Sequence, residues 1–341
     1  MKNLEKIAWG KTWPFILMHI LPLGVLLTGI RGIDVLVCLF LYYVRMFFIT
    51  AGYHRYFAHR SYSMGRIMQF IMAFGGASAA QKGPLWWASY HRHHHHYSDT
   101  DKDIHSPVKG FWWSHIGWIM CRKYDQPRLD LVKDLAAYPE LRFLDNYYLL
   151  PPTVLGIICY FMGGTSMLFG GFFLSTLLLY HGTFFINSLT HLWGKRRFVT
   201  NDSSRNSFLL ALITCGEGWH NNHHYFPASV RQGFFWWEID ISYYILSIIK
   251  WVRLVKKFTL PTSFILQKKR LKDGNFDDGL FNVSWQKVLA LFPNHPLDRA
   301  KLYVFAKQKA LESWMKQGQL STRELKQIIY QTLSTLQYQS E

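Results

Sequence analysis

Histidine is the residue type whose number and spacing most clearly indicate chemistry in this sequence. Sixteen histidines occur, and most of them fall into three short clusters. The clusters read HRYFAH from His54, HRHHH from His91 and HNNHH from His220, and a further histidine, His191, follows Asn187 by four residues. Neutral imidazole nitrogens bind iron, zinc, copper and nickel, so these clusters predict a metal site.

The spacing within the clusters indicates which histidines can act together. Two clusters place three histidines at positions i, i+3 and i+4, which share one face of a helix. In the first cluster the two histidines are five residues apart, so the pair needs a bent helix end or two metals. His93 and His96 fall off the shared face and are excluded. Nine candidate ligands remain, enough for two metals: His54, His59, His91, His94, His95, His191, His220, His223 and His224.

Other interpretations of the histidines are less consistent with their arrangement. A surface tract that scavenges metal would explain a single run, but three separated clusters favour a shared site. A structural zinc needs four ligands, and nine donors exceed that number. Asn187, one turn before His191, is positioned to hold a metal-bound water. The solitary histidines are expected to be structural: His19, His105, His115, His181 and His295.

The elements that must position these residues are apolar helices. Four runs approach the roughly 20 residues that a bilayer requires: residues 13–30, 33–50, 147–163 and 168–186. Short turns join them in pairs, so the sequence predicts an all-α integral membrane protein built from two helical hairpins. Basic residues concentrate in the N-terminal segment, in the segment between the two hairpins and after the fourth run. Because basic segments stay in the cytoplasm, both termini and all the histidine clusters are predicted to lie on the cytoplasmic side.

The rest of the chain is predicted to cover that cytoplasmic face. Residues 51–146 and 187–261 form a cap and complete a membrane domain of residues 1–261, and residues 262–341 form a helical tail. A helix over 66–80 is expected to lie on the cytoplasmic face of the membrane, with a fifth span as the alternative. Arg45, within the second run, faces either the bundle or the interface, and snorkelling to the interface is the favoured expectation. The net charge of +17 is explained by the membrane bias, because no nucleic-acid-binding motif accompanies it.

These motifs resemble those of the membrane fatty acid desaturases, in particular the stearoyl-CoA (delta-9) acyl desaturases and their bacterial relatives. HRYFAH is similar to the family's HxxxxH box, HRHHH to its HxxHH box, NSLTHLWG to its ninth-ligand motif and GEGWHNNHHYFP to its third box. The resemblance covers residues 13–261. It implies that the nine histidines hold two ferrous ions, with Asn187 bound through a water. It also implies that Gln81, Trp87 and Thr183 line the bend of an acyl tunnel.

The resemblance further implies an activity, which we state as an expectation. The enzyme would insert a cis double bond at delta-9 into a saturated long-chain acyl-CoA in a bacterial inner membrane. It would use O2 and two electrons from a separate electron-donor protein. Ser89 and Tyr90 replace an Arg-Asp pair of the animal enzymes, so phospholipid and carrier protein remain alternative acyl carriers. The alternative functions are a di-iron hydroxylase of alkanes or lipids and a metal-ion transporter.

Overall fold

The chain folds mainly into helices. The computed structural model describes residues 6–271, 275–317 and 320–338, and any prediction for the other positions lies outside the described residues. One two-stranded antiparallel sheet joins β1 (Ser63–Met64) to β2 (Val255–Lys256). The helical content agrees with the predicted fold class.

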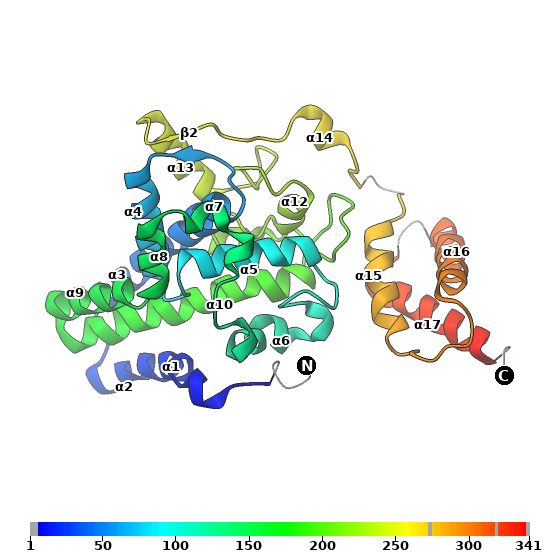
Figure 1. Cartoon of the computed structure of the whole chain (residues 1–341), viewed down its shortest axis with the longest axis horizontal. Helices are drawn as coiled ribbons and strands as arrows, with labels where there is room; N and C mark the ends of the chain where they lie inside the picture. The colour runs from blue at the N-terminus through cyan, green and yellow to red at the C-terminus, as the bar shows by residue number, and fades with distance from the viewer. Residues whose placement is uncertain (1–5, 272–274, 318–319, 339–341) are drawn as a thin grey trace.

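Two helices of the described chain are long and apolar enough to cross a membrane, Gly32–Ala58 and Leu150–His191. The longer one is a hairpin, because Gly164 (φ +70°) adopts a conformation that breaks it into two arms. These arms lie side by side in Figure 1 and correspond to the third and fourth predicted runs. The segments of the two helices are α3 (Gly32–Phe47), a π-helix (Phe48–Ala58), α9 (Leu150–Ser166), a second π-helix (Met167–Phe173), α10 (Leu174–Ser188) and a 3-10 turn (Leu189–His191).

The first predicted run is shorter and less regular than the others. It comprises α1 (Trp9–Ile20), a 3-10 turn (Leu21–Gly24) and α2 (Val25–Thr28). Pro22 lies in that turn, where its missing N–H interrupts the α-helical hydrogen bonds. The apolar stretch Thr12–Thr28 is therefore short for a bilayer span, and the topology of four spans stays a prediction.

Arg45 lies inside the helical bundle, so the prediction that it snorkels is wrong. Its side chain is 1% exposed. The guanidinium donates to the Ser175 hydroxyl at 2.6 Å and to the Thr176 hydroxyl at 2.7 Å, both on α10. Its Nε donates to the Leu41 carbonyl at 3.0 Å. These polar groups replace the water that a snorkelling side chain would reach.

The cap packs against the π-helix Phe48–Ala58. Its main core joins this helix to α4 (Arg66–Ala77) and α5 (Pro84–Tyr97) through buried side chains such as Tyr53, Phe57 and Met72. The helix predicted over 66–80 is α4, which ends at Ala77 and leaves Ile67 81% exposed. The cap helices are α4 (Arg66–Ala77), α5 (Pro84–Tyr97), α6 (Phe111–His115), α7 (Lys133–Ala136), α8 (Pro139–Asn146), α11 (Phe208–Ile213), α12 (His220–Tyr225) and α13 (Ile241–Trp251).

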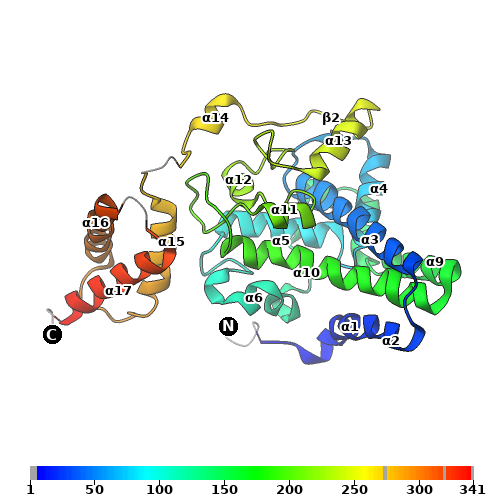
Figure 2. The same ribbon diagram turned by 180° about the vertical axis from the view of Figure 1, so that it is seen from behind.

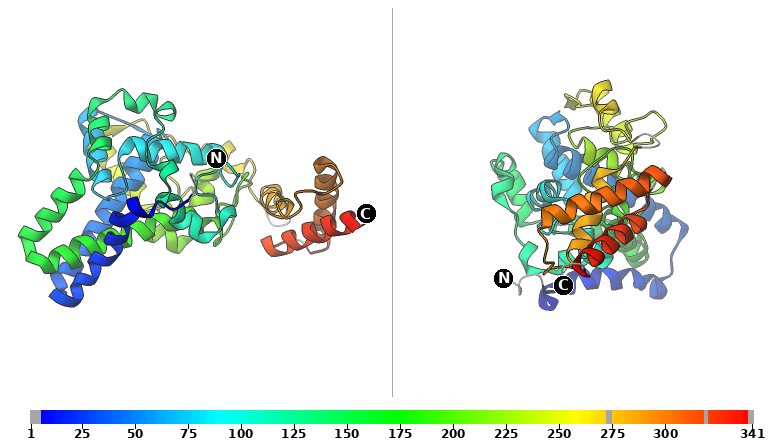
Figure 3. Two further views of the ribbon diagram at one scale, coloured as in Figure 1. Left: turned by 60° about the horizontal axis from the view of Figure 1, so that its bottom comes forward. Right: turned by 90° about the vertical axis from the view of Figure 1, so that its right-hand side faces the viewer.

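The tail forms a helical unit with its own core. After α14 (Ser263–Gln267) come α15 (Asp278–Leu289), α16 (Arg299–Gln317) and α17 (Thr322–Tyr338). The core of α15–α17 contains Phe281, Leu302 and Ile329, each fully buried. Figures 2 and 3 show this unit at the end of the molecule opposite the α9–α10 hairpin turn. The boundary at residue 261 stays a prediction.

Candidate metal centre

The structure brings all nine predicted ligands together in two groups. Within each group, the candidate ligand atoms lie within 4.8 Å of one another. We call them the five-histidine group and the four-histidine group. The first contains His54, His59, His91, His95 and His223, and the second contains His94, His191, His220 and His224.

The π-helix explains the five-residue spacing of the first cluster. In a π-helix the hydrogen bonds connect residues five apart. The His59 N–H donates to the His54 carbonyl at 3.2 Å, and the two ring centroids are 4.8 Å apart. A wider helical turn, rather than a division between two metals, therefore places both rings in the five-histidine group.

The other two clusters each contribute to both groups. On α5, His91 and His95 join the five-histidine group, whereas His94 turns towards the other one. On α12, His223 is separated from His220 and His224 in the same way. The ring centroids of His95 and His224 are 4.5 Å apart across the boundary. The two groups are therefore neighbours and suit a pair of metal ions.

Buried carboxylates hold the outer nitrogens of four candidate ligands. Metal-binding histidines usually donate the other ring N–H to such a partner, which fixes the tautomer. An Nδ1 that donates to a carboxylate leaves an Nε2 lone pair directed at the centre of the group. The pairs and their distances are His54–Glu217 at 2.6 Å, His94–Asp103 at 3.0 Å, His191–Asp99 at 3.3 Å and His224–Asp202 at 2.7 Å.

The inner nitrogens fit a pair of bound cations. The Nε2 atoms of His54 and His223 are 3.0 Å apart, and those of His191 and His220 are 3.2 Å apart. Each pair is close enough for an N–H···N hydrogen bond when one ring carries its proton on Nε2, and for a shared cation when both Nε2 lone pairs face inwards. The buried Nε2 of His224 has no hydrogen-bond partner among the described residues. Imidazole donors of this kind suit divalent first-row metals, iron included.

Burial also favours the metal-binding protonation state of the ligands. It holds the pKa of each of four histidines well below the usual value, and the charges of neighbouring histidines lower each pKa further. These rings are therefore neutral near pH 7, the form that binds metals. They are His91, His95, His220 and His223.

The residues that support the ligands were not predicted from the sequence. Asp99 and Asp103 follow the second cluster directly in YSDTDKD, and that proximity was an available signal. Glu217 precedes His220 by three residues, whereas Asp202 carried no signal. His105, which was expected to be merely structural, forms a third potential metal group with His94 and Asp103.

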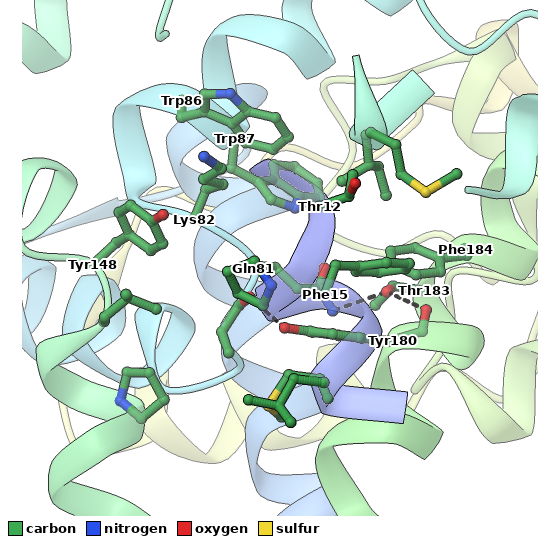
Figure 4. Close-up of a pocket in the computed structure, with 18 of the residues that line it drawn as sticks. Thr12, Phe15, Gln81, Lys82, Trp86, Trp87, Tyr148, Tyr180, Thr183 and Phe184 are labelled. Atoms are coloured by element: carbon green, nitrogen blue, oxygen red, sulfur yellow. Dashed lines mark hydrogen bonds between the residues drawn. The ribbon is translucent and has the colours of Figure 1, made fainter. Parts of the chain in front are cut away.

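A largely apolar cavity of about 700 Å³ extends to the five-histidine group. Its wall includes the three predicted substrate-binding residues, and also Asn187. The Trp87 ring stacks on His91 with centroids 4.9 Å apart. The Gln81 amide donates to the Thr183 hydroxyl at 2.9 Å, as Figure 4 shows. The roles of these residues, and a water held by Asn187, stay predictions.

Several known proteins are similar to this chain over more than half of its length. A family model described as fatty acid desaturase matches residues 33–254. An sn-2 palmitoyl-lipid 9-desaturase of Nostoc is 42% identical over 61% of this chain and 75% of its own length. An acyl-CoA C20 Delta5-desaturase of Anemone leveillei is 34% identical over 80% of this chain and 91% of its own. An sn-1 stearoyl-lipid 9-desaturase of Anabaena variabilis is 36% identical over 72% and 91%, respectively. The chain belongs to the fatty acid desaturase family.

Proposed function

We propose that this protein inserts a cis double bond at delta-9 into a saturated long-chain acyl group. The reaction would use O2, two ferrous ions and two electrons from a separate donor protein. The observation that carries the proposal is the contact between Trp87 and His91, because it brings the wall of an apolar cavity against a candidate metal ligand. Family membership favours desaturation over hydroxylation and over metal transport.

The histidines and their carboxylate partners would hold the metals. Breaking the C–H bond of an unactivated methylene needs a strong oxidant, which the bound irons would supply by activating O2 and which side chains do not supply. Asp103 and Asp202 keep the rings of His94 and His224 oriented by accepting their Nδ1–H groups. Glu217 and Asp99 place carboxylate oxygens 2.6 Å and 3.3 Å from the Nδ1 atoms of His54 and His191. The protein thereby fixes the ligand geometry before substrate enters.

The cavity would select which carbons react. Its apolar walls exclude water and hold an acyl chain by burial. The hydrogen bond between Gln81 and Thr183 connects the loop before α5 to α10, and Tyr180 strengthens this connection by donating to the Ala80 carbonyl at 2.8 Å. A wall fixed in this way sets the position of the chain relative to the metal centre.

The acyl carrier and the membrane arrangement are part of the proposal. Relatives are named for acyl-lipid and for acyl-CoA substrates, so we propose the acyl group and let the assay compare the carriers. We also propose that four segments span a bacterial inner membrane, with both termini and the metal centre in the cytoplasm. The described helices Gly32–Ala58 and Leu150–His191 support this arrangement.

Expression in a desaturase-deficient host, followed by double-bond mapping of its lipids, tests the activity. We expect unsaturated chains from the wild type and none from His220→Ala, which lacks a candidate ligand of the four-histidine group. His96→Ala is the matched control, because His96 belongs to the second cluster but is exposed and lies in neither histidine group. Hydroxylated chains, or product from His220→Ala, would contradict the proposal.

The carrier requires an assay with purified protein. Stearoyl-CoA and vesicles of a stearoyl glycerolipid are supplied separately, with a reducing system and O2. Formation of unsaturated product from only one of them identifies the carrier. Failure with both, while the host accumulates unsaturated lipid, would point to an acyl carrier protein as the carrier.

A further inference from the structure

The residues that contact the outer (Nδ1) nitrogens of the candidate ligands form the outer shell of each histidine group. The loop of residues 200–204 carries part of this outer shell for the four-histidine group. The Asp202 carboxylate holds the Nδ1 of His224 at 2.7 Å. The Ser203 N–H donates at 2.6 Å to Asp99, whose other oxygen lies 3.3 Å from the Nδ1 of His191. Any displacement of this loop therefore moves the partners of two of the four candidate ligands.

Arg196 fixes the shape of that loop. Its Nη1 donates to the carbonyls of Asp202 at 2.6 Å and Ser204 at 3.1 Å, and its Nη2 donates to the Thr200 carbonyl at 3.2 Å. The Arg196 side chain is almost fully buried. A guanidinium with several fixed donors makes a rigid anchor when a counter-ion holds it in place.

The counter-ion comes from the C-terminal unit. Asp277 accepts from the Nε of Arg196 at 2.7 Å and from its Nη2 at 3.3 Å. The same carboxylate caps α15 by accepting from the Leu280 N–H at 3.0 Å. One side chain thus connects the first turn of α15 to the anchor of the loop.

The backbone of α15 also packs directly against the loop. A Cβ on Gly279 would lie 1.8 Å from the Thr200 carbonyl oxygen, so only glycine permits this approach. Farther along α15, burial lowers the pKa of Lys287, and the negative charge of nearby Asp99 opposes that shift. On α17, the Thr322 hydroxyl accepts from Arg205 at 3.0 Å. The unit therefore contacts the segment around the loop at several points.

We propose that the α15–α17 unit positions the outer shell of the four-histidine group, with Asp277 and Gly279 as positioning residues for the metal bound there. This inference rests on the metal centre of the proposed function. It gives a role to helices that lie beyond residues 33–254, the region that the family model matches. Without the Asp277 carboxylate, Arg196 loses its charged partner and the loop gains freedom, so Asp202 and Asp99 orient their histidines less firmly.

The test measures metal retention by the full-length protein. The wild type, Asp277→Asn and Gly279→Ala are loaded anaerobically with ferrous iron and equilibrated with increasing chelator, and iron per chain is measured. Asparagine still caps a helix, so Asp277→Asn removes the charge and spares α15. Asp278→Asn is the matched control, because Asp278 pairs at 2.8 Å with Lys307 inside the unit.

We expect both variants to release one of two iron ions at a chelator concentration that the wild type and Asp278→Asn withstand. Removing an outer-shell partner typically weakens metal binding 10–100-fold, and the less direct effect here should be up to about tenfold. Retention of both ions with wild-type affinity in both variants would overturn the inference. Loss of both ions at the same chelator concentration would also overturn the inference, because the weakened metal binding would then not be confined to the four-histidine group. A wild-type protein that binds no iron would instead refute the metal centre itself.

Discussion

Glu217 offers the sharpest test of how the five-histidine group is held. One of its oxygens accepts from the Nε and Nη2 of Arg55 at 3.1 and 3.0 Å, and the other lies 2.6 Å from the Nδ1 of His54. In Glu217→Gln, the amide oxygen must face Arg55, because a guanidinium only donates. The amide NH2 then faces His54 and pushes its proton to Nε2, which removes the lone pair that would bind the metal.

The size of the effect follows from the contacts that remain. Loss of such a partner weakens metal binding about 10–100-fold, or roughly 1.4–2.7 kcal/mol. Arg55 keeps Asp240 at 2.9 Å, so no uncompensated buried charge results. The free energy of unfolding should therefore fall by only about 1–3 kcal/mol, the cost of one poorly satisfied buried polar group.

The amount of ferrous iron that the protein retains against a chelator measures the change in metal binding. Thermal unfolding, recorded in parallel, measures the change in stability. Glu140→Gln is the matched control, because Glu140 pairs at 2.7 Å with Arg66, whose side chain is 63% exposed. That change should leave iron binding unaltered. A Glu217→Gln protein that is folded and binds iron as tightly as the wild type would refute this account of the outer shell.

Three further predictions concern stability. The metal-free protein should lose stability as the pH falls below about 6.5, because its buried histidines with lowered pKa values resist protons that the unfolded chain accepts. Thermal unfolding with and without iron measures this loss. Stability that rises on acidification would contradict the prediction. Gly76→Ala should destabilise the protein by about 1–3 kcal/mol, because its Cβ would lie 2.2 Å from the Tyr53 ring; denaturant unfolding, with Gly10→Ala as control, checks it. Arg45→Met should lower the unfolding temperature, because buried polar groups on α10 lose their donor; an unchanged temperature would show that the guanidinium contributes little.

The sequence alone determined the identity of the candidate ligands. Metal-binding residue types at i, i+3 and i+4 are a local property, and helix geometry brings them to one face without reference to the rest of the fold. The long apolar runs were equally local, since length and composition decide whether a helix can cross a bilayer. The run interrupted by Pro22 shows the limit of that reasoning, because hydropathy does not report where a helix breaks.

Only the tertiary structure decided how the ligands are divided and supported. The spacing of His54 and His59 becomes intelligible once a π-helix is seen to connect them. The carboxylates of Glu217, Asp202 and Asp99 reach their histidines from distant segments, so no local pattern could pair them. The contact of Asp277 with Arg196 spans 81 residues. The sequence therefore specified the candidate ligands, whereas chain folding decided which buried charges lie beside them.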